Sequence, residues 1–265
     1  MSNLNNKKII ITGASGGIGE PLVKLLAKEK VELFLLSSNS EKLKKLGEEI
    51  EACGSKVNYI EADLASVEGI TSAAQKLSQI SAPDILINLA GISYFGSLGM
   101  QKHQDIAKLY NVNLLAPTLL SQALLAEMVA NSSGHIVNIG SIFGSIAFPF
   151  FATYSASKAG LRGFSESLRR ELMGSGVKVS YIAPRAVKTK INEGKVSEFL
   201  KKTKSNIDEA ELVAQKIFSI LQSQKSYAYF GFPESLFVRV NYLLPKLVDC
   251  ALKSKGDIAK TILNN

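Results

Sequence analysis

The chain has 265 residues, of which 46% are hydrophobic and 20% charged, and this composition excludes a disordered protein. Its formal net charge is +8, but the excess lysines occur in short runs that we interpret as solvated faces, so we expect no nucleic-acid partner. Two distant cysteines, Cys53 and Cys250, and two isolated histidines predict a reduced, cytoplasmic protein without a metal site.

Apolar runs alternate with stretches of helical periodicity along the chain. The apolar runs predict strands at 7–13, 31–37, 56–64, 83–91, 134–141 and 177–184. The periodic stretches predict helices at 19–30, 40–53 (capped by Ser40), 66–80, 103–131 (containing Pro117), 154–174 and 210–221. Because parallel strands need crossover helices, this alternation predicts an α/β fold, a doubly wound parallel sheet with helices on both faces in a single domain.

The predicted domain covers residues 1–226. Residues 227–265 read as an irregular apolar and basic extension, in which Pro245 interrupts any helix. Three roles stay open for this segment: packing on the domain or on a partner subunit, covering a substrate cleft, or contact with a membrane surface.

A glycine-rich stretch, "TGASGGIG" at 12–19, follows the first predicted strand and opens the first helix. Gly13, Gly17 and Gly19 let the backbone turn tightly and approach a pyrophosphate at the helix N-terminus. An ordinary glycine turn has the same composition, but its place in the alternating pattern favours a dinucleotide and a Rossmann-type domain.

The end of the second predicted strand should meet the adenosine ribose of such a cofactor. It carries Ser37, Ser38 and Asn39, with neither an acid nor an arginine. Hydroxyl and amide groups can donate to a phosphate, and no carboxylate there would repel it. We therefore expect NADP(H) to be preferred over NAD(H).

In "YSASK", Tyr154 and Lys158 lie one helical turn apart on the same face. Alone, such a pair is more often a chance surface feature than an acid–base pair. Ser141, at the end of the fifth predicted strand, strengthens the functional interpretation, and Ser145 is its competitor.

The ordered motifs "TGASGGIG", "ADL" (62–64), "NLAG" (88–91), "NVNL" (111–114), "IGS" (139–141), "YSASK" and "PRAVKT" (184–189) resemble the short-chain dehydrogenase/reductase family over residues 7–190. The resemblance implies a catalytic set of Asn113, Ser141, Tyr154 and Lys158. It implies cofactor contacts from Gly13, Ser15, Gly17, Ile18, Gly19, Ser37, Ser38, Asn39, Asp63, Leu64, Asn88, Ala90, Gly91, Tyr154, Lys158, Pro184, Val187 and Thr189.

The expected chemistry is hydride transfer between a nicotinamide cofactor and a carbonyl or secondary alcohol. Tyr154 would move the proton, with its pKa lowered by Lys158, which would also hold the nicotinamide ribose. Ser141 would hold the substrate oxygen, and Asn113 would hold a water that relays protons. The resemblance also implies a homodimer or homotetramer formed through the two long helices.

Three departures from the family pattern stand out: "NLAG" has a leucine where a second asparagine is usual, Arg185 replaces a glycine, and the usual Asp-Gly-Gly ending is absent. Arg185 can narrow the site or offer a charge to an anionic substrate. Phenylalanines around the Ser141–Tyr154 loop (Phe143, Phe148, Phe150 and Phe151) favour an apolar substrate. The alternatives are a 3-oxoacyl thioester reductase and a non-catalytic nucleotide-sensing module.

Overall fold

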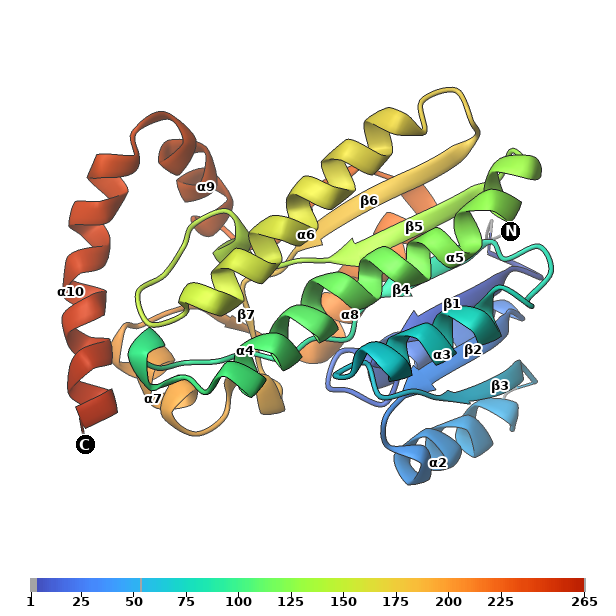
Figure 1. The fold of residues 1–265 in the computed structure, drawn as a ribbon, viewed down its shortest axis with the longest axis horizontal. Coiled ribbons are helices and arrows are strands. Elements are labelled where there is room, and N and C mark those ends of the chain that lie inside the picture. Colours follow the sequence, from blue (N-terminus) through green and yellow to red (C-terminus); the bar gives the residue numbers. More distant parts are fainter. Residues whose placement is uncertain (1–3, 53, 265) are drawn as a thin grey trace.

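The computed structural model describes residues 4–52 and 54–264, which form a seven-stranded parallel sheet in the order β3-β2-β1-β4-β5-β6-β9 (Figure 1). The strands are Lys8–Thr12 (β1), Glu32–Ser37 (β2), Lys56–Glu61 (β3), Ile85–Asn88 (β4), Gly134–Ile139 (β5), Val177–Ala183 (β6) and Tyr227–Tyr229 (β9). From β1 the chain builds outward to β2 and β3, then returns to add β4 on the other side, so the strand order switches between β1 and β4. The Rossmann-type α/β fold predicted from the sequence is confirmed.

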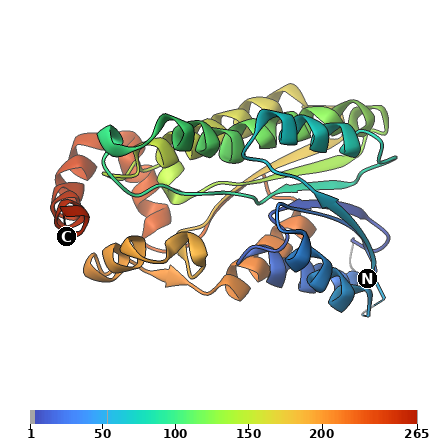
Figure 2. The same cartoon turned by 60° about the horizontal axis from the view of Figure 1, so that its bottom comes forward.

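Helices cover both faces of the sheet (Figure 2). One face carries α1 (Gly19–Leu26), α2 (Ser40–Glu51) and α8 (Ala210–Ser223); the other carries α3 (Val67–Leu77), α5 (Ala116–Ala130) and α6 (Ala152–Glu171). The alternation of β1 shows why: Ile9 and Ile11 pack in one apolar cluster, and Ile10 packs in the other. All three are fully buried, as the continuous apolar runs require.

The start of α2 differs by one residue from the prediction. Asn39 is the N-cap, because its Oδ1 accepts a hydrogen bond of 2.8 Å from the Lys42 amide, and Ser40 is already helical. Cys53, where the sequence placed the end of this helix, lies outside the described residues.

The predicted helix over 103–131 is continuous from His103 to Ala130 but changes its winding in the middle. After α4 (His103–Tyr110), residues Asn111–Leu115 form a π-helical turn, and α5 follows with Pro117 in its first turn. Pro117 has no N–H, so the Asn113 carbonyl lacks its usual helical donor, and a wider turn accommodates the mismatch. The run is long and apolar enough to span a bilayer, but it packs on α3 and the sheet as core helices do.

The region after β6 contains more regular structure than the sequence predicted. Short strands β7 (Ala186–Val187) and β8 (Ile207–Asp208) pair around α7 (Lys195–Lys202). Beyond residue 226 the main sheet continues with β9, followed by α9 (Glu234–Leu243) and α10 (Pro245–Asn264). The prediction of an irregular extension was wrong, because the segment is helical on both sides of Pro245. Pro245 does interrupt the helical run as predicted: α9 ends at Leu243, and Pro245 takes the first position of α10, where its missing N–H is harmless.

Single 3-10 turns complete the chain: η1 (Ala27–Glu29) extends α1, while η2 (Leu98–Met100), η4 (Ile142–Gly144) and η5 (Lys190–Asn192) lie in the loops after β4, β5 and β7. In Figure 1, α7, α9 and α10 gather at the end of the sheet toward which β5 and β6 point. The helices that the sequence did not predict, α7, α9 and α10, therefore surround the carboxyl ends of the strands.

Candidate active site

A cavity of about 300 Å³ opens at the carboxyl ends of the central strands, beside the point where the strand order switches. Its lining includes the residues that directly follow β4, β5 and β6: Leu89 and Gly91, Gly140 and Ser141, and Pro184. The predicted site residues that line it are Ile18, Gly91, Ser141, Tyr154, Lys158, Pro184, Val187 and Thr189. The remaining predicted cofactor residues extend from it along the ends of β1, β2, β3 and β4.

The glycine loop packs tightly against the segments after β4 and β7, at positions where no side chain would fit. Gly13 has a φ of +68°, and a Cβ on it would lie 2.9 Å from the Ala90 Cα. A Cβ on Gly17 would lie 2.5 Å from Thr189 Cγ2, which brings the loop against the segment after β7. No side chain of the described residues caps α1, although the Glu20 amide donates to the Gly16 carbonyl at 3.0 Å. The positive end of the helix dipole therefore lies beside the glycine loop, where it would favour a pyrophosphate.

The adenosine end of the site is polar and free of carboxylates at the end of β2. Ser37 Oγ lies 2.6 Å from Ser15 Oγ and accepts a hydrogen bond of 3.2 Å from the Asn39 amide. Asn39 caps α2 through its oxygen, which leaves its amide nitrogen free to donate. Asp63 is exposed after β3 and accepts from the Ala65 amide at 3.0 Å.

Asn88 turns its side chain into the protein interior. Its Nδ2 donates to Asn138 Oδ1 at 2.8 Å, and Asn138 Nδ2 donates to Ser165 Oγ at 2.9 Å, which ties β4 to β5 and α6. Thr12, which the sequence analysis did not single out, holds the loop after β4 instead. Its Oγ1 accepts from the amides of Leu89 and Ala90, both at 3.0 Å. The signal for Thr12 was its place at the start of the glycine motif.

Ser141 and Tyr154 meet at the cavity, Ser141 from the end of β5 and Tyr154 from the first turn of α6. Ser141 Oγ accepts a hydrogen bond of 3.1 Å from the Phe143 amide, which orients the hydroxyl. Its competitor Ser145 bonds to the Tyr229 hydroxyl at 3.4 Å, away from Tyr154, and does not line the cavity. The geometry therefore favours Ser141 as the partner of Tyr154.

Burial raises the pKa of the Tyr154 phenol above its ordinary value of 10, and the hydrogen bond with Ser141 acts in the opposite direction. The sequence analysis expected Lys158 to lower this pKa. In the structure Lys158 instead donates from Nζ to the Ile139 carbonyl at 2.9 Å, and the desolvation of the phenol dominates. Burial also lowers the pKa of Lys158 to about 8.

Asn113 lies in the π-helical turn, and its side chain forms three hydrogen bonds. Its Oδ1 accepts from the Ile92 amide at 2.9 Å, and its Nδ2 donates to the Ile92 carbonyl at 2.9 Å and to Ser157 Oγ at 3.0 Å. Ser157 in turn donates to the Tyr154 carbonyl at 2.8 Å. Asn113 therefore connects the loop after β4 to the helix that carries Tyr154, and Ser157 is a link that the sequence analysis missed.

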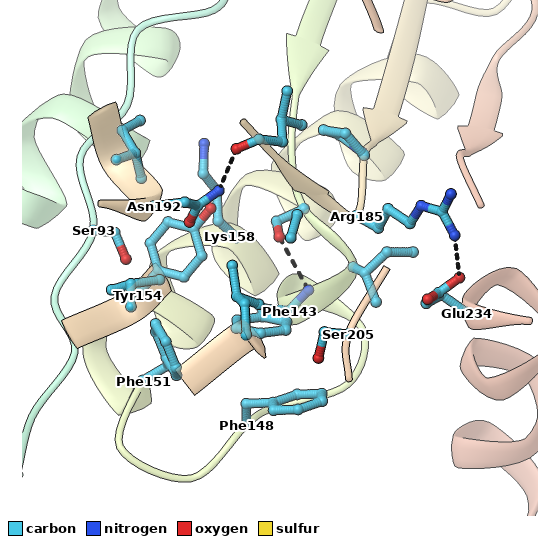
Figure 3. Close-up of a pocket in the computed structure, with 18 of the residues that line it drawn as sticks. Ser93, Phe143, Phe148, Phe151, Tyr154, Lys158, Arg185, Asn192, Ser205 and Glu234 are labelled. Atoms are coloured by element: carbon cyan, nitrogen blue, oxygen red, sulfur yellow. Dashed lines mark hydrogen bonds and ion pairs between the residues drawn. The ribbon is translucent and has the colours of Figure 1, made fainter. Parts of the chain in front are cut away.

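Arg185 does not offer a free charge to the cavity. Its guanidinium donates to Asp208 Oδ1 at 2.7 and 3.1 Å. It also donates to Glu234 Oε2 at 3.2 Å (Figure 3). These contacts raise its pKa further, chiefly through Asp208. Of the two roles considered for Arg185, the structure favours a clamp between β8 and α9 over an anion site.

The wall opposite the cofactor loop is aromatic. Phe143 stacks on Phe148 with ring centroids 4.3 Å apart and meets Tyr154 edge-on at 6.3 Å. Figure 3 shows Phe143, Phe148 and Phe151 on the same side of the cavity as Tyr154. Phe151 belongs to a cluster completed by Phe199 of α7 and by Ala259 and Ile262 of α10, so α10 packs on the catalytic domain.

Comparison with known proteins identifies this arrangement. The family model described as short chain dehydrogenase matches residues 7–199. The chain belongs to the short-chain dehydrogenase/reductase family. It is 36% identical over 185 residues to the ketoacyl reductase HetN of Nostoc sp., covering 69% of this chain and 64% of that protein. It is 33% identical over 243 residues to the 3-oxoacyl-[acyl-carrier-protein] reductase FabG of Rickettsia typhi, covering 92% of this chain and 91% of that protein.

Among solved structures, a metagenomic short-chain oxidoreductase in complex with NADP has a TM-score of 0.72 and 30% identity, with 86% of this chain and 97% of that chain covered. As a short-chain dehydrogenase/reductase, the chain is an NAD(P)-dependent oxidoreductase that acts on alcohol and ketone groups. The glycine loop and uncapped α1 fit the dinucleotide, which supplies the hydride chemistry.

Proposed function

We propose that this short-chain dehydrogenase/reductase reduces the carbonyl of an apolar substrate with NADPH, or oxidises the corresponding secondary alcohol. The observation that carries the proposal is the meeting of Ser141, Tyr154 and Lys158 at one end of a cavity whose wall is aromatic. Asn113 braces that set through Ile92 and Ser157. The aromatic wall supports an apolar substrate, because burial of aromatic and aliphatic surface is the main source of affinity in such cavities.

In this mechanism Ser141 donates a hydrogen bond to the substrate oxygen and stabilises the charge that develops there. Tyr154 gives its phenolic proton to the same oxygen during reduction and takes it back during oxidation. Lys158 lines the same cavity, with its Nζ on the Ile139 carbonyl at 2.9 Å and close to Gly91, and it would hold the nicotinamide ribose there. The apolar wall excludes water from the reacting oxygen.

The preference for NADP(H) rests on the end of β2. Ser15, Ser37 and the free amide of Asn39 supply donors beside the N-terminus of α2, whose dipole favours negative charge. A carboxylate at this point would bind ribose hydroxyls and repel a 2′-phosphate. A ratio of kcat/KM for NADPH over NADH above about 10 would support the preference, and a ratio in favour of NADH would contradict it.

A second candidate is the reduction of 3-oxoacyl thioesters. Two relatives are named as ketoacyl or 3-oxoacyl carrier-protein reductases, and the net charge of +8 suits an acidic carrier protein. The α9–α10 segment that replaces the usual family ending weighs against this version. Assay of an acetoacetyl thioester beside simple ketones separates the two candidates.

The residue-level test is Tyr154→Phe. Because the substitution removes the phenolic hydroxyl and keeps the ring, we expect kcat to fall by at least about 100-fold while NADPH binding, followed by nucleotide fluorescence, stays nearly unchanged. Tyr59→Phe, an exposed tyrosine on β3, is the control and should keep full activity. Turnover that survives in Tyr154→Phe would remove Tyr154 from the acid–base role.

Assembly and location complete the proposal. We propose a cytoplasmic homodimer or homotetramer formed through the α4–α5 and α6 helices. Light scattering of the full chain measures the subunit number, and a monomer would contradict the assembly.

A further inference from the structure

The C-terminal helix α10 contributes a charged group to the cavity. Lys255 of α10 lines it, and its Nζ lies over the ring of Phe148, 5.3 Å from the centroid. Phe148 stacks on Phe143, which meets Tyr154 edge-on. An aromatic wall therefore runs from the catalytic phenol to an ammonium group.

The position of Lys255 is set by packing around it. Ala259 and Ile262, one and two turns further along α10, are buried against Phe151, Phe199 and Leu200. The neighbouring Gly256 lies near Pro149, where a Cβ would be in ordinary contact with the proline ring at 3.5 Å. The half-buried Lys255 is thus held against the loop between Ser141 and Tyr154, whereas Lys253 on the same helix is exposed.

The charged residues that line the cavity near α10 leave an excess of positive charge. Glu234 is the acidic residue among the lining residues. Its carboxylate accepts hydrogen bonds from Arg185 at 3.2 Å and from Asn206 at 3.0 Å. Lys255 and Lys204 also line the cavity, and within residues 4–52 and 54–264 neither forms an ion pair. An apolar cavity with unpaired ammonium groups at its rim is matched to a molecule that is apolar along its length and anionic at one end.

We propose that Lys255 selects substrates that carry a carboxylate or phosphate at the end remote from the reacting carbonyl. The carbonyl lies at Ser141 and Tyr154, the apolar part lies along Phe143 and Phe148, and the anion pairs with Lys255. This inference rests on the proposed carbonyl reduction and adds the charge of the substrate to it. It also assigns α10 a direct part in specificity.

The test uses methyl ketones of increasing chain length, each supplied as the terminal carboxylate, the terminal phosphate and the neutral methyl ester. With NADPH, the full-length protein should show kcat/KM at least about fivefold higher for an anionic member than for the ester of equal length. The comparison of carboxylate with phosphate identifies the anion. A preference for the esters at every length overturns the inference.

Lys255→Met keeps the apolar stem that covers Phe148 and removes the charge. It should raise KM for the anionic substrates and leave kcat and the esters nearly unchanged. Lys255→Arg should retain the preference, and Lys253→Met, with the same change of charge on an exposed turn of α10, should match the wild type. Equal loss for anions and esters in Lys255→Met would show a packing role and overturn the inference.

Failure of the proposed function would look different. In that case no ketone of the series, charged or neutral, would oxidise NADPH or NADH in the wild-type protein. Turnover of the esters without an anion preference, by contrast, would leave the reductase in place and remove only the role of Lys255.

Discussion

At the scale of single residues, burial sets the protonation chemistry of the site. Tyr154 and Lys158 were recognisable from their spacing, but their environment was not. The phenol is held neutral by desolvation, and the ammonium is held by the Ile139 carbonyl in a setting that lowers its pKa to about 8. A lysine with a lowered pKa is easier to discharge near neutral pH, which would suit the proton relay expected from the sequence.

The lowered pKa of Lys158 predicts a pH-dependent penalty on folding. Its folded pKa of about 8 lies below the ordinary value of 10.5, so the cost of burying the charge is full below pH 8 and vanishes above pH 10.5. Relative to Lys158→Met, the wild type should therefore gain about 3 kcal/mol of unfolding free energy between pH 7.5 and pH 10.5. Urea denaturation of both proteins at several pH values measures this, with Lys178→Met as the exposed control. Parallel pH profiles for the wild type and Lys158→Met would contradict the burial of a charged lysine.

At the scale of secondary-structure elements, ion pairs join β8 and α9 to the end of β6, beside the apolar clusters that hold α7, α9 and α10. Arg185 lies just after the end of β6 and forms ion pairs with Asp208 of β8 and Glu234 of α9. Asp208 is 4% exposed, so its carboxylate depends on this partner and on Lys216 at 3.7 Å. These ion pairs hold together the cavity wall around Arg185 and Glu234 and fix the start of α9, which is followed by α10 and Lys255.

Removal of the Arg185 ion pairs should destabilise this wall of the cavity. Arg185→Ala leaves a buried carboxylate with weakened compensation, and we expect a loss of about 2–3 kcal/mol of unfolding free energy, because Arg185 is itself partly exposed. Thermal and urea unfolding measure the loss. The control is Lys188→Ala, which breaks the exposed pair with Glu209 and should cost less than about 1 kcal/mol. Similar losses for both variants would contradict a structural role for the clamp.

At the scale of the whole molecule, the two ends of the sheet carry different groups of polar residues. The carboxyl ends carry the site, and the amino ends carry a buried polar contact centred on His135 at the start of β5. Its Nε2 lies 2.7 Å from Ser180 Oγ, which itself donates to the Lys225 carbonyl at 2.6 Å. Ser180 must therefore accept from Nε2–H, and burial lowers the pKa of His135 to about 4.

His135 consequently links global stability to acid. Its folded pKa of about 4 lies below the ordinary value of 6.5, so the unfolded chain binds the extra proton as the pH falls through this window. Relative to His135→Phe, the wild type should lose about 3 kcal/mol of unfolding free energy between pH 6.5 and pH 4. Urea denaturation across this range is the measurement. As a control, His103→Phe at an exposed site should leave the pH dependence of the unfolding free energy unchanged. The same pH dependence in His135→Phe as in the wild type would contradict the burial of a neutral His135.

The sequence by itself determined the alternating fold, the glycine loop and the identity of the residues that meet at the strand ends. These depend on local periodicity and on short motifs, which are visible in the chain without knowledge of its packing. The three-dimensional structure decided what depends on distant partners: that Arg185 is neutralised by Asp208 and Glu234, that Asn88 turns inward to Asn138, and that burial raises the pKa of Tyr154. It also decided that residues 234–264 form two helices and that Lys255 reaches the cavity. Helix α10 owes its position to apolar contacts with Phe151 and Phe199, and both residues lie far from α10 in the sequence.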